Sequence, residues 1–387
     1  MKAWPIVPLR SVLRSYIDAV PSIQLDTVNL AGVYGFGRGL FQRGPISPLD
    51  TTYKSFHRLN SGDFVISSPK AWEGAVARIP EEFDGWFLSP VFPTFRANSE
   101  ALDTHFLDWY CKRDAVWRQL QGKAKGMGAR RESVSPDQFL SLEIPLPPLA
   151  EQKTIVARLD ALAEKTRQVE AHLDAVERDA EHLLALRFRD AIADAPMRPM
   201  ADVAPFVRRP VEIDIETRYR EVGARSFGKG LFIKPDFDGA EATWQKPVWI
   251  NTGDLVLSNI KAWEGAIAIA GDEHEGCIAS HRYITCVPDP ELATAGFLAY
   301  YLLSEDGLEK IGLASPGTAD RNRTLSLGNL GKIEVPLPPL AVQQTFDRLQ
   351  AEIAALKAKH TAIRQANAAL IPSTLERVFG VEPTGAR

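Results

Sequence analysis

Cysteine is scarce in this sequence of 387 residues, which contains only Cys111, Cys277 and Cys286. An odd number of scattered cysteines excludes a disulfide framework, and the lack of a Cys-x-x-Cys pair argues against structural zinc. The sequence also lacks any run of about 18 apolar residues, so we predict no membrane-spanning helix. Residues 1–5 contain no apolar signal core. We therefore expect a cytoplasmic protein.

Net charge is also small. The chain has 45 Lys and Arg against 49 Asp and Glu, which gives a formal charge of −4. Dedicated nucleic-acid-binding proteins are usually basic, so any such function must come from local patches. The 45% hydrophobic and 24% charged residues are typical of a globular protein and exclude wholesale disorder. The length predicts two or three domains.

Catalytic and cofactor motifs are missing as well. The glycine-rich segment at 35–39 is not followed by a helix start, as a dinucleotide-binding loop requires. The only Pro-Pro pairs, at 147–148 and 338–339, are flanked by Leu, unlike the target-amine loop of an amino-methyltransferase. The acidic run at 272–275 is predicted to be a solvated turn, and no Ser–His pair supports a triad. We therefore predict no catalytic residues, no metal site and no cofactor in this chain.

What the sequence does contain is an internal repeat with a constant offset of 191 residues. Four motifs recur without insertion or deletion: Phe-Gly-(Arg/Lys)-Gly-Leu-Phe at 36–41 and 227–232, Gly-Asp at 62–63 and 253–254, Lys-Ala-Trp-Glu-Gly-Ala at 70–75 and 261–266, and (Ile/Val)-Pro-Leu-Pro-Pro-Leu-Ala at 144–150 and 335–341. Such a period is too long for a solenoid unit. The pattern predicts tandem duplication of a whole module, which presents two similar surfaces.

Each half begins with a segment of mixed character. Short strands are predicted after the Gly-Asp turns and near 92–95 and 283–287, with the Pro93 copy as an edge strand. Helices are predicted over 102–120 and 297–311. No strand–helix–strand alternation dominates, so the predicted class is α+β, with two similar globular domains.

Two long helices follow the proline-rich motifs. Residues 150–195 contain neither Gly nor Pro, and their apolar residues follow the 4-3 spacing of a coiled coil, as do those after the second motif. The polar seam residues His360 and Asn367 are expected to set register. An antiparallel pair is predicted. The predicted organisation is globular domain 1–149, helix 150–195, globular domain 196–340, helix 341–379 and tail 380–387.

Some repeated residues suit DNA contact. In the Lys-Ala-Trp-Glu-Gly-Ala copies, a Lys is able to contact phosphate and a Trp to stack, although a structural turn with a Lys–Glu pair explains the motif equally well. A basic, glycine-rich loop precedes each proline-rich motif, where cations suit a phosphate backbone. The candidates are Lys70, Trp72, Lys261, Trp263, Arg130, Arg131, Arg321 and Arg323.

The full pattern resembles the specificity (S) subunit of Type I restriction–modification systems. It comprises a globular domain, Pro-Leu-Pro-Pro-Leu-Ala, Glu151-Gln152 (Val342-Gln343 in the second copy) and a heptad helix, all repeated. Val342 departs from the usual Glu. The resemblance implies a non-catalytic subunit whose two target-recognition domains each read half of a bipartite DNA site. Its coiled coil would set the gap and dock two methyltransferase subunits. Those partners would bring S-adenosylmethionine, and a restriction subunit would bring ATP and Mg.

The resemblance also points to the segments 67–72 and 258–263 as DNA-facing, and more weakly to Arg38 and Lys229. Base contacts are expected where the halves differ, as at Ser68 and Asn259 or at Tyr34 and Arg225. Two other interpretations stay open: an enzyme whose motifs are not apparent, and a coiled-coil scaffold that binds only protein.

Overall fold

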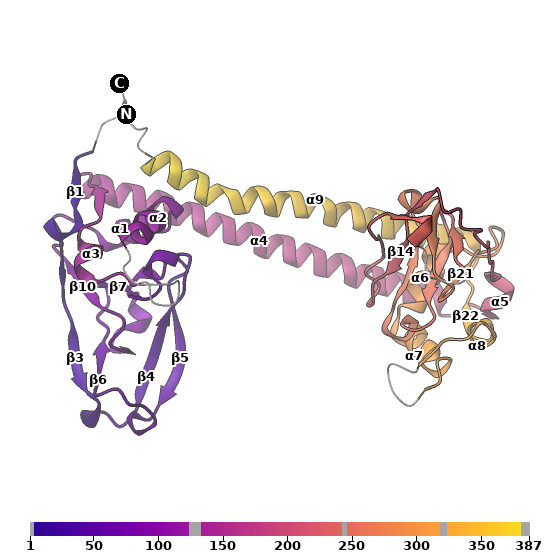
Figure 1. Ribbon diagram of the computed structural model, residues 1–387, viewed down its shortest axis with the longest axis horizontal. Helices are drawn as coiled ribbons and strands as arrows, with labels where there is room; N and C mark the ends of the chain where they lie inside the picture. The colour runs from indigo at the N-terminus through magenta and orange to yellow at the C-terminus, as the bar shows by residue number, and fades with distance from the viewer. Residues whose placement is uncertain (1–3, 124–132, 242–245, 318–322, 381–387) are drawn as a thin grey trace. The chain divides into compact units, whose positions relative to one another are not determined.

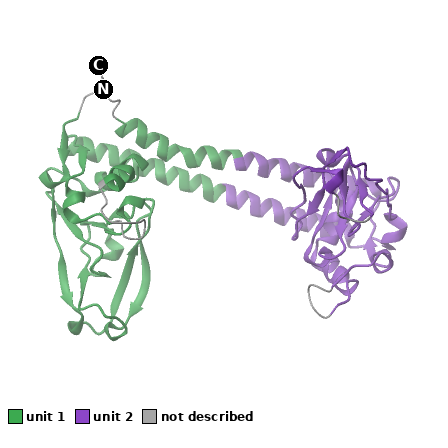
Figure 2. Ribbon diagram, in the orientation of Figure 1, with its two compact units in different colours: residues 1–172, 362–387 green, residues 173–361 purple. Residues whose placement is uncertain are grey.

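The computed structural model describes residues 4–123, 133–241, 246–317 and 323–380. The chain divides into two compact units, shown in Figure 2: residues 1–172 with 362–387 form unit 1, and residues 173–361 form unit 2. Each unit contains one globular domain and a segment of each of two long helices, α4 (Leu149–Ile192) and α9 (Leu340–Phe379). Within the described ranges, no helix is long and apolar enough to cross a membrane.

Unit 1 contains two larger sheets and a strand pair (Figure 1). The five-stranded sheet has the order β3 (Asp18–Pro21), β6 (Ser55–Arg58), β9 (Phe87–Leu88), β4 (Val28–Val33) and β5 (Leu40–Ile46), with only β4 and β9 parallel. The antiparallel four-stranded sheet has the order β2 (Leu13–Ser15), β10 (Thr94–Ala97), β7 (Phe64–Ile66) and β8 (Val76–Arg78). Strand β1 (Ile6–Pro8) pairs with β11 (Glu143–Pro145), which carries the first residues of the proline-rich motif.

Helices α1 (Thr104–Cys111), α2 (Asp114–Lys123) and α3 (Pro136–Leu140) complete the domain of unit 1. Their apolar side chains and those of the four-stranded sheet form the main core, where the rings of Phe64 and Phe139 stack at 5.8 Å. The core also takes in the first turns of α4 and the last turns of α9, through Val156 and Phe379. The domain and the helix pair therefore share one core, whose burial is the main stabilising term.

Unit 2 repeats this plan with shorter sheets. Its three-stranded sheet has the order β19 (Ile267–Ile269), β18 (Leu255–Ser258) and β21 (Tyr283–Cys286). Its strand pairs are β12 (Met197–Pro199) with β22 (Glu334–Pro336), β13 (Arg218–Tyr219) with β16 (Phe237–Asp238), β14 (Val222–Ala224) with β15 (Leu231–Ile233), and β17 (Val248–Ile250) with β20 (Cys277–Ala279). Strands β18 and β7 follow the two Gly-Asp turns, as the sequence predicts.

The helices of unit 2 are α5 (Met200–Val203), α6 (Ala295–Leu302), α7 (Glu305–Leu313) and α8 (Leu327–Gly331). Phe188 near the end of α4 and Phe346 near the start of α9 both enter its core, and their rings lie 5.4 Å apart. Helix ends from both copies of the repeat therefore pack into each domain core.

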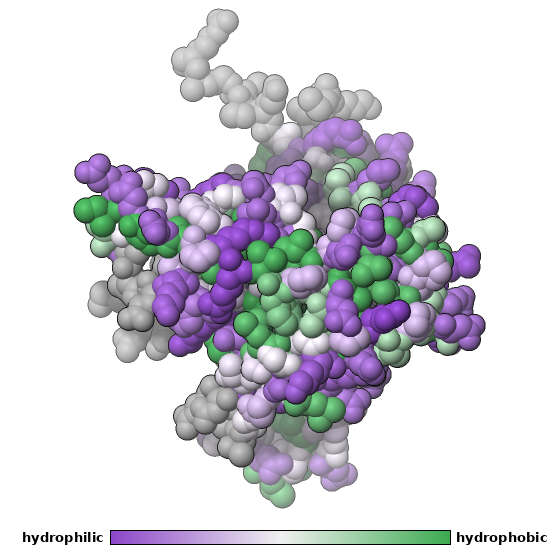
Figure 3. Space-filling view, turned by 90° about the vertical axis from the view of Figure 1, so that its right-hand side faces the viewer, coloured by the Kyte–Doolittle hydropathy of each residue, from purple (hydrophilic) through white to green (hydrophobic). Residues whose placement is uncertain are grey.

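Figure 3, which looks onto unit 2, shows apolar surface in the middle of that face, rimmed by hydrophilic side chains.

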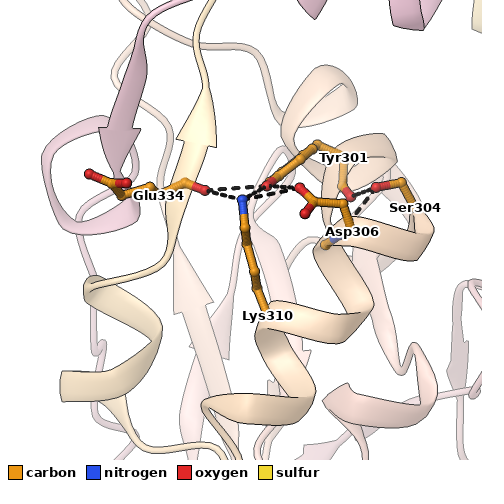
Figure 4. Close-up of polar contacts among 6 residues, drawn as sticks. Tyr301, Ser304, Asp306, Lys310 and Glu334 are labelled. Atoms are coloured by element: carbon orange, nitrogen blue, oxygen red, sulfur yellow. Dashed lines mark hydrogen bonds and ion pairs between the residues drawn. The ribbon is translucent and has the colours of Figure 1, made fainter.

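A polar network ties α6, α7 and β22 together (Figure 4). The Tyr301 hydroxyl donates to Asp306 Oδ2 at 2.5 Å and accepts from Lys310 Nζ at 2.5 Å. Lys310 Nζ also donates to the Glu334 carbonyl at 3.3 Å. Burial, followed by the contact with Asp306, raises the pKa of Tyr301 to about 12. The network holds the strand that leads into the second proline-rich motif.

The two long helices run antiparallel in each unit. In unit 1, Asn367 Nδ2 of α9 donates to the Thr166 carbonyl at 3.0 Å and to Glu170 Oε1 at 2.8 Å. In unit 2, His360 Nδ1 lies 2.8 Å from Glu177 Oε1, and Lys357 Nζ 2.7 Å from Glu181 Oε1. Residue numbers rise along α4 as they fall along α9. The seam positions of His360 and Asn367 thus face carboxylates of the partner helix.

A buried glutamine joins each long helix to its domain. Gln152 is fully buried, accepts from the Asp103 amide at 2.9 Å, and donates to the Ala101 and Pro147 carbonyls, both at 2.8 Å. Gln343 makes the same three contacts in unit 2, with the Thr294 amide and the Leu292 and Pro338 carbonyls. Each glutamine therefore bonds a carbonyl of its proline-rich motif and two backbone groups of the preceding domain at the point where the long helix begins.

Several boundaries differ from the sequence prediction. The helix predicted over 102–120 is two helices, as is that over 297–311, where the Ser304 hydroxyl caps α7 by accepting from the Gly307 amide. Strand β10 begins after Pro93 and lies inside its sheet, so the edge-strand prediction was wrong. Helix α4 ends at Ile192, three residues before the predicted end, because the residue before Pro196 disfavours helical geometry. Helix α9 continues through Pro372 to Phe379.

Candidate nucleic-acid interface

The two Lys-Ala-Trp-Glu-Gly-Ala segments adopt the same tight turn. In unit 1 the 3-10 helix η4 (Ala71–Glu73) ends at Gly74, whose φ of 76° favours glycine. Lys70 Nζ donates to Glu73 Oε1 at 2.7 Å and lies 5.2 Å from the centroid of the Trp72 ring. The Trp72 indole donates to the Pro69 carbonyl at 3.1 Å. In unit 2, around η7 (Ala262–Glu264), the corresponding values are 2.6 Å for Lys261 and Glu264, 5.0 Å for Lys261 and Trp263, and 3.0 Å for Trp263 and Ile260.

These contacts define what the turn does locally. The tryptophans are half-buried and brace the loop, and each lysine is held at the surface with 53% and 42% of its side chain exposed. The hydrogen bond from Lys261 lowers the pKa of the Glu264 carboxyl. An ion pair this exposed contributes little stability, so either lysine is able to exchange its carboxylate partner for a phosphate at small cost.

A second loop is bonded to each turn. The amides of Phe36 and Gly37 donate to the carbonyls of Glu73 and Gly74 at 2.7 and 2.9 Å. In unit 2 the amides of Phe227 and Gly228 donate to Glu264 and Gly265, both at 2.8 Å. We call the pair of segments 34–43 and 68–74 the unit 1 composite loop, and 225–234 with 259–265 the unit 2 composite loop. Arg38 and Lys229, predicted by symmetry, are exposed on these loops.

The flanks of the predicted basic loops lie beside the same turns. The Val134 amide donates to the Ser68 carbonyl at 2.8 Å, and the Leu325 amide to the Asn259 carbonyl at 2.7 Å. The Arg323 guanidinium stacks 4.6 Å above the Trp263 ring and donates to the Gly312 carbonyl. In unit 2, the predicted residues Arg323 and Trp263, which are distant in sequence, are thus adjacent, whereas in unit 1 the described neighbour of the turn is Val134.

The remaining predicted DNA-contact residues differ in whether and how the structure places them. Arg130, Arg131 and Arg321 lie outside the described residues. Asn259 Oδ1 is a buried side-chain acceptor with no hydrogen-bond partner, the single such atom within the described ranges. A buried acceptor left unpaired is costly, which marks Asn259 as different from its counterpart Ser68.

The described residues contain neither a metal-ligand group nor an exposed thiol. No group of three or more His, Cys, Asp or Glu among them is arranged to hold a metal ion. The three cysteines are buried, and burial raises the pKa of the Cys286 thiol to about 12, so its reactive thiolate is scarce at neutral pH.

One feature of the composite loops was not predictable from the sequence. Phe36 and Phe227 have φ of 61° and 63°, a left-handed conformation that phenylalanine rarely adopts, and are 62% and 76% exposed. Their repetition within Phe-Gly-(Arg/Lys)-Gly was visible in the sequence, but their backbone angles were not.

Comparisons with known proteins agree with this geometry. The family model described as Type I restriction modification DNA specificity domain matches residues 15–178. The HsdS subunit from Thermoanaerobacter tengcongensis is similar in fold, with a TM-score of 0.64 and 21% identity over 98% of this chain and 97% of that chain. A chain from a structural study of complex assembly and conformational transition of the type I R-M system gives a TM-score of 0.68 and 21% identity, over 98% of both chains. No curated protein matches the sequence.

The segment that matches this DNA specificity family carries the unit 1 composite loop. Residues 15–178 belong to the Type I restriction modification DNA specificity family, and the predicted likeness to the S subunits of those systems is confirmed.

Proposed function

We propose that this chain is the non-catalytic recognition subunit of a Type I restriction–modification complex in the cytoplasm, and that each globular domain reads one half of a bipartite DNA site. One observation carries the proposal: unit 2, beyond the matched segment, repeats the loop geometry of unit 1. Lys70 and Lys261 have φ, ψ of −134°, 8° and −137°, 8°. Two domains with one architecture are suited to dock on two half-sites related by pseudo-twofold symmetry.

Shared and divergent residues of the composite loops would divide the contacts. Lys70 and Lys261, which recur in both halves, are proposed to meet phosphates, which are the same in both half-sites. Arg323, which stacks on Trp263, is proposed to meet a phosphate in unit 2. Ser68 and Asn259 are proposed to read bases, because they differ and lie where each basic loop rejoins its domain. Arg38, Lys229, Trp72, Trp263, Arg130, Arg131 and Arg321 complete the proposed DNA-binding set.

The helices are proposed to form an antiparallel coiled coil that sets the gap between half-sites. Apolar residues such as Leu173 and Ile353 are buried along the seam, and the facing pair His360 and Glu177 adds a polar contact that one register satisfies. The domain organisation would follow the predicted boundaries, with tandem duplication as its origin.

Partner subunits would supply the chemistry. Two methyltransferase subunits are proposed to dock on the helical region and bring S-adenosylmethionine, and restriction subunits would add ATP-driven steps with Mg. What supports this division of labour is the match of residues 15–178 to a family described by DNA specificity.

The first test is co-expression of this chain with the neighbouring methyltransferase gene, followed by genome-wide mapping of methylated adenine. We expect a bipartite motif with a fixed gap that disappears when this chain is deleted. Double charge reversal, Lys261→Glu with Arg323→Glu, should weaken DNA binding and reduce its dependence on salt. The matched control is Arg218→Glu with Lys332→Glu, at two exposed residues of unit 2 outside the composite loop and the long helices.

An alternative is a coiled-coil scaffold without DNA specificity, favoured by the long helix pair itself. Unchanged methylation after deletion, together with unchanged affinity and salt dependence in the charge-reversal variant, would establish the scaffold instead. Methyl transfer by the purified chain alone would identify it as an enzyme.

A further inference from the structure

Phe36 and Phe227 combine two unfavourable features, a left-handed backbone conformation and an exposed apolar ring. Each backbone lies in the left-handed region, where Gly or Asn fits better, and each large apolar side chain is mostly exposed. Only one other non-glycine residue of the described chain, Lys246, has a positive φ. A doubly unfavourable residue that occurs at equivalent positions of both units indicates selection for binding rather than for stability.

The composite loop also holds each ring in place. The amide of each Phe and that of the following Gly are bonded to the carbonyls that close the neighbouring turn. In unit 1 an added Cβ at Gly37 would meet Lys112 Cγ at 2.8 Å, so the backbone packs closely against the C-terminal end of α1. The ring is therefore presented to the outside by a fixed backbone, which lowers the entropic cost of inserting it into a partner.

The surrounding charge favours nucleic acid as the partner. Residues 34–43 contain two cations and no acid, and residues 225–234 contain three cations and no acid, in a chain whose net charge is −4. Lys229 Nζ lies 5.8 Å from the Phe227 ring centroid. An aromatic ring next to cations matches a base stack flanked by phosphates.

A protein partner common to both units fits less well. In unit 2 the Phe227 ring borders an apolar hollow of about 600 Å³, lined also by Tyr300, Leu303 and Leu308. In unit 1 the residue equivalent to Leu308 is Trp117, which packs edge-on against Phe36 at 5.9 Å. The two units therefore share the ring and its neighbouring cations, while the apolar residues beside the ring differ. A partner common to both units is one that recognises the ring and the cations, as DNA would in both half-sites.

We propose that Phe36 and Phe227 are DNA-contacting wedges, each placing its ring against an opened base step of its half-site. This inference rests on the proposed function and adds two residues and a mode of contact to it. Apolar side chains that enter a base step unstack it and make affinity depend on how easily that step opens. Sequence preference at these steps would then arise without hydrogen bonds to the bases.

The test uses the complex of this chain with its methyltransferase partner and a duplex that carries the mapped site. Phe36→Asn and Phe227→Asn remove the rings, and Asn accepts the left-handed backbone. We expect binding about tenfold weaker for each variant, with an unchanged salt slope and an unchanged or higher Tm. A 2-aminopurine at the contacted step should brighten with the wild-type complex and not with the variant.

Three control variants distinguish the effect of the ring from the effects of the neighbouring charge and of apolar surface in general. Phe227→Trp keeps a flat ring and should retain affinity, whereas Lys229→Ala should reduce the salt slope by about one. Ile215→Ala removes an apolar side chain of similar exposure, 70%, outside the composite loop and should change nothing.

Unchanged affinity in both Asn variants would overturn the wedge. So would loss of the methyltransferase subunit from Phe227→Asn with DNA affinity intact in the remaining complex, since the ring would then dock protein. Failure of the wild-type complex to bind the mapped duplex would refute the proposed function itself and is seen before any variant is made.

Discussion

At the start of each long helix a single glutamine side chain bonds three backbone groups of its unit. Gln152 and Gln343 are fully buried, and all their partners lie on the chain just before the helix or on the segment that leads into α1 or α6. Burial makes such a residue costly to remove, because the backbone groups it satisfies have no access to water.

Gln152→Met, which conserves length and removes the polar atoms, is expected to lower the free energy of unfolding by about 2–4 kcal/mol. Chemical denaturation of the purified chain would measure this loss. The control is Gln168→Met on the same helix, where the amide bonds only the exposed Glu164 side chain. Equal stabilities for the two variants would contradict the structural role assigned to Gln152.

The residues of the composite loops show how much of the local structure can be predicted from the sequence. The Lys70–Glu73 pair was one of two interpretations of its motif, and the structure contains it in both copies. The left-handed angles of Phe36 and Phe227 were not predictable, because only glycine or asparagine signals such a conformation in a sequence.

At the scale of elements, the long helices were predicted within three residues, since an uninterrupted heptad pattern specifies a helix and its apolar face. Their attachment was not predictable. Arg113 is buried and donates to both carboxylate oxygens of Glu376, at 3.2 and 2.9 Å, across 263 residues of sequence. The equivalent positions in unit 2 are Ser304 and Ala185, so the repeat gives no hint of this contact.

That contact should make the anchoring of α9 depend on pH. The hydrogen bond from Arg113 lowers the pKa of the Glu376 carboxyl below its usual range. A carboxyl with a lowered folded-state pKa stabilises the fold fully above its unfolded pKa, and this contribution is lost as the pH falls through the folded value. Arg113→Met should therefore cost about 1 kcal/mol at neutral pH, since Glu376 is half-exposed, and much less near pH 3.

Thermal unfolding of both proteins across this pH range measures the difference. Arg167→Met removes an exposed pair with Glu164 on α4 and should have little effect at any pH. If Arg113→Met loses the same stability at pH 3 as at pH 7, the arginine acts through packing of its side chain rather than through charge.

At the scale of the whole molecule, the coiled coil that is proposed to set the gap between half-sites can be lengthened at one place in each helix. The boundary between the units crosses α4 after His172 and α9 after Thr361, between the contacts of Asn367 in unit 1 and of His360 in unit 2. A heptad inserted at both points preserves the seam pattern on either side, because each helix regains its register after seven residues.

Seven residues add roughly 10.5 Å of helix, which corresponds to about three base pairs of B-DNA at 3.4 Å each. We therefore expect methylation mapping of the double-insertion variant to give the same two half-sites with a gap about three base pairs longer. Insertion into α4 alone leaves the seam unmatched on one side and should abolish the motif. An active double-insertion variant that keeps the original gap would show that the helices do not set the spacing, because the distance between domains would then be fixed elsewhere in the complex.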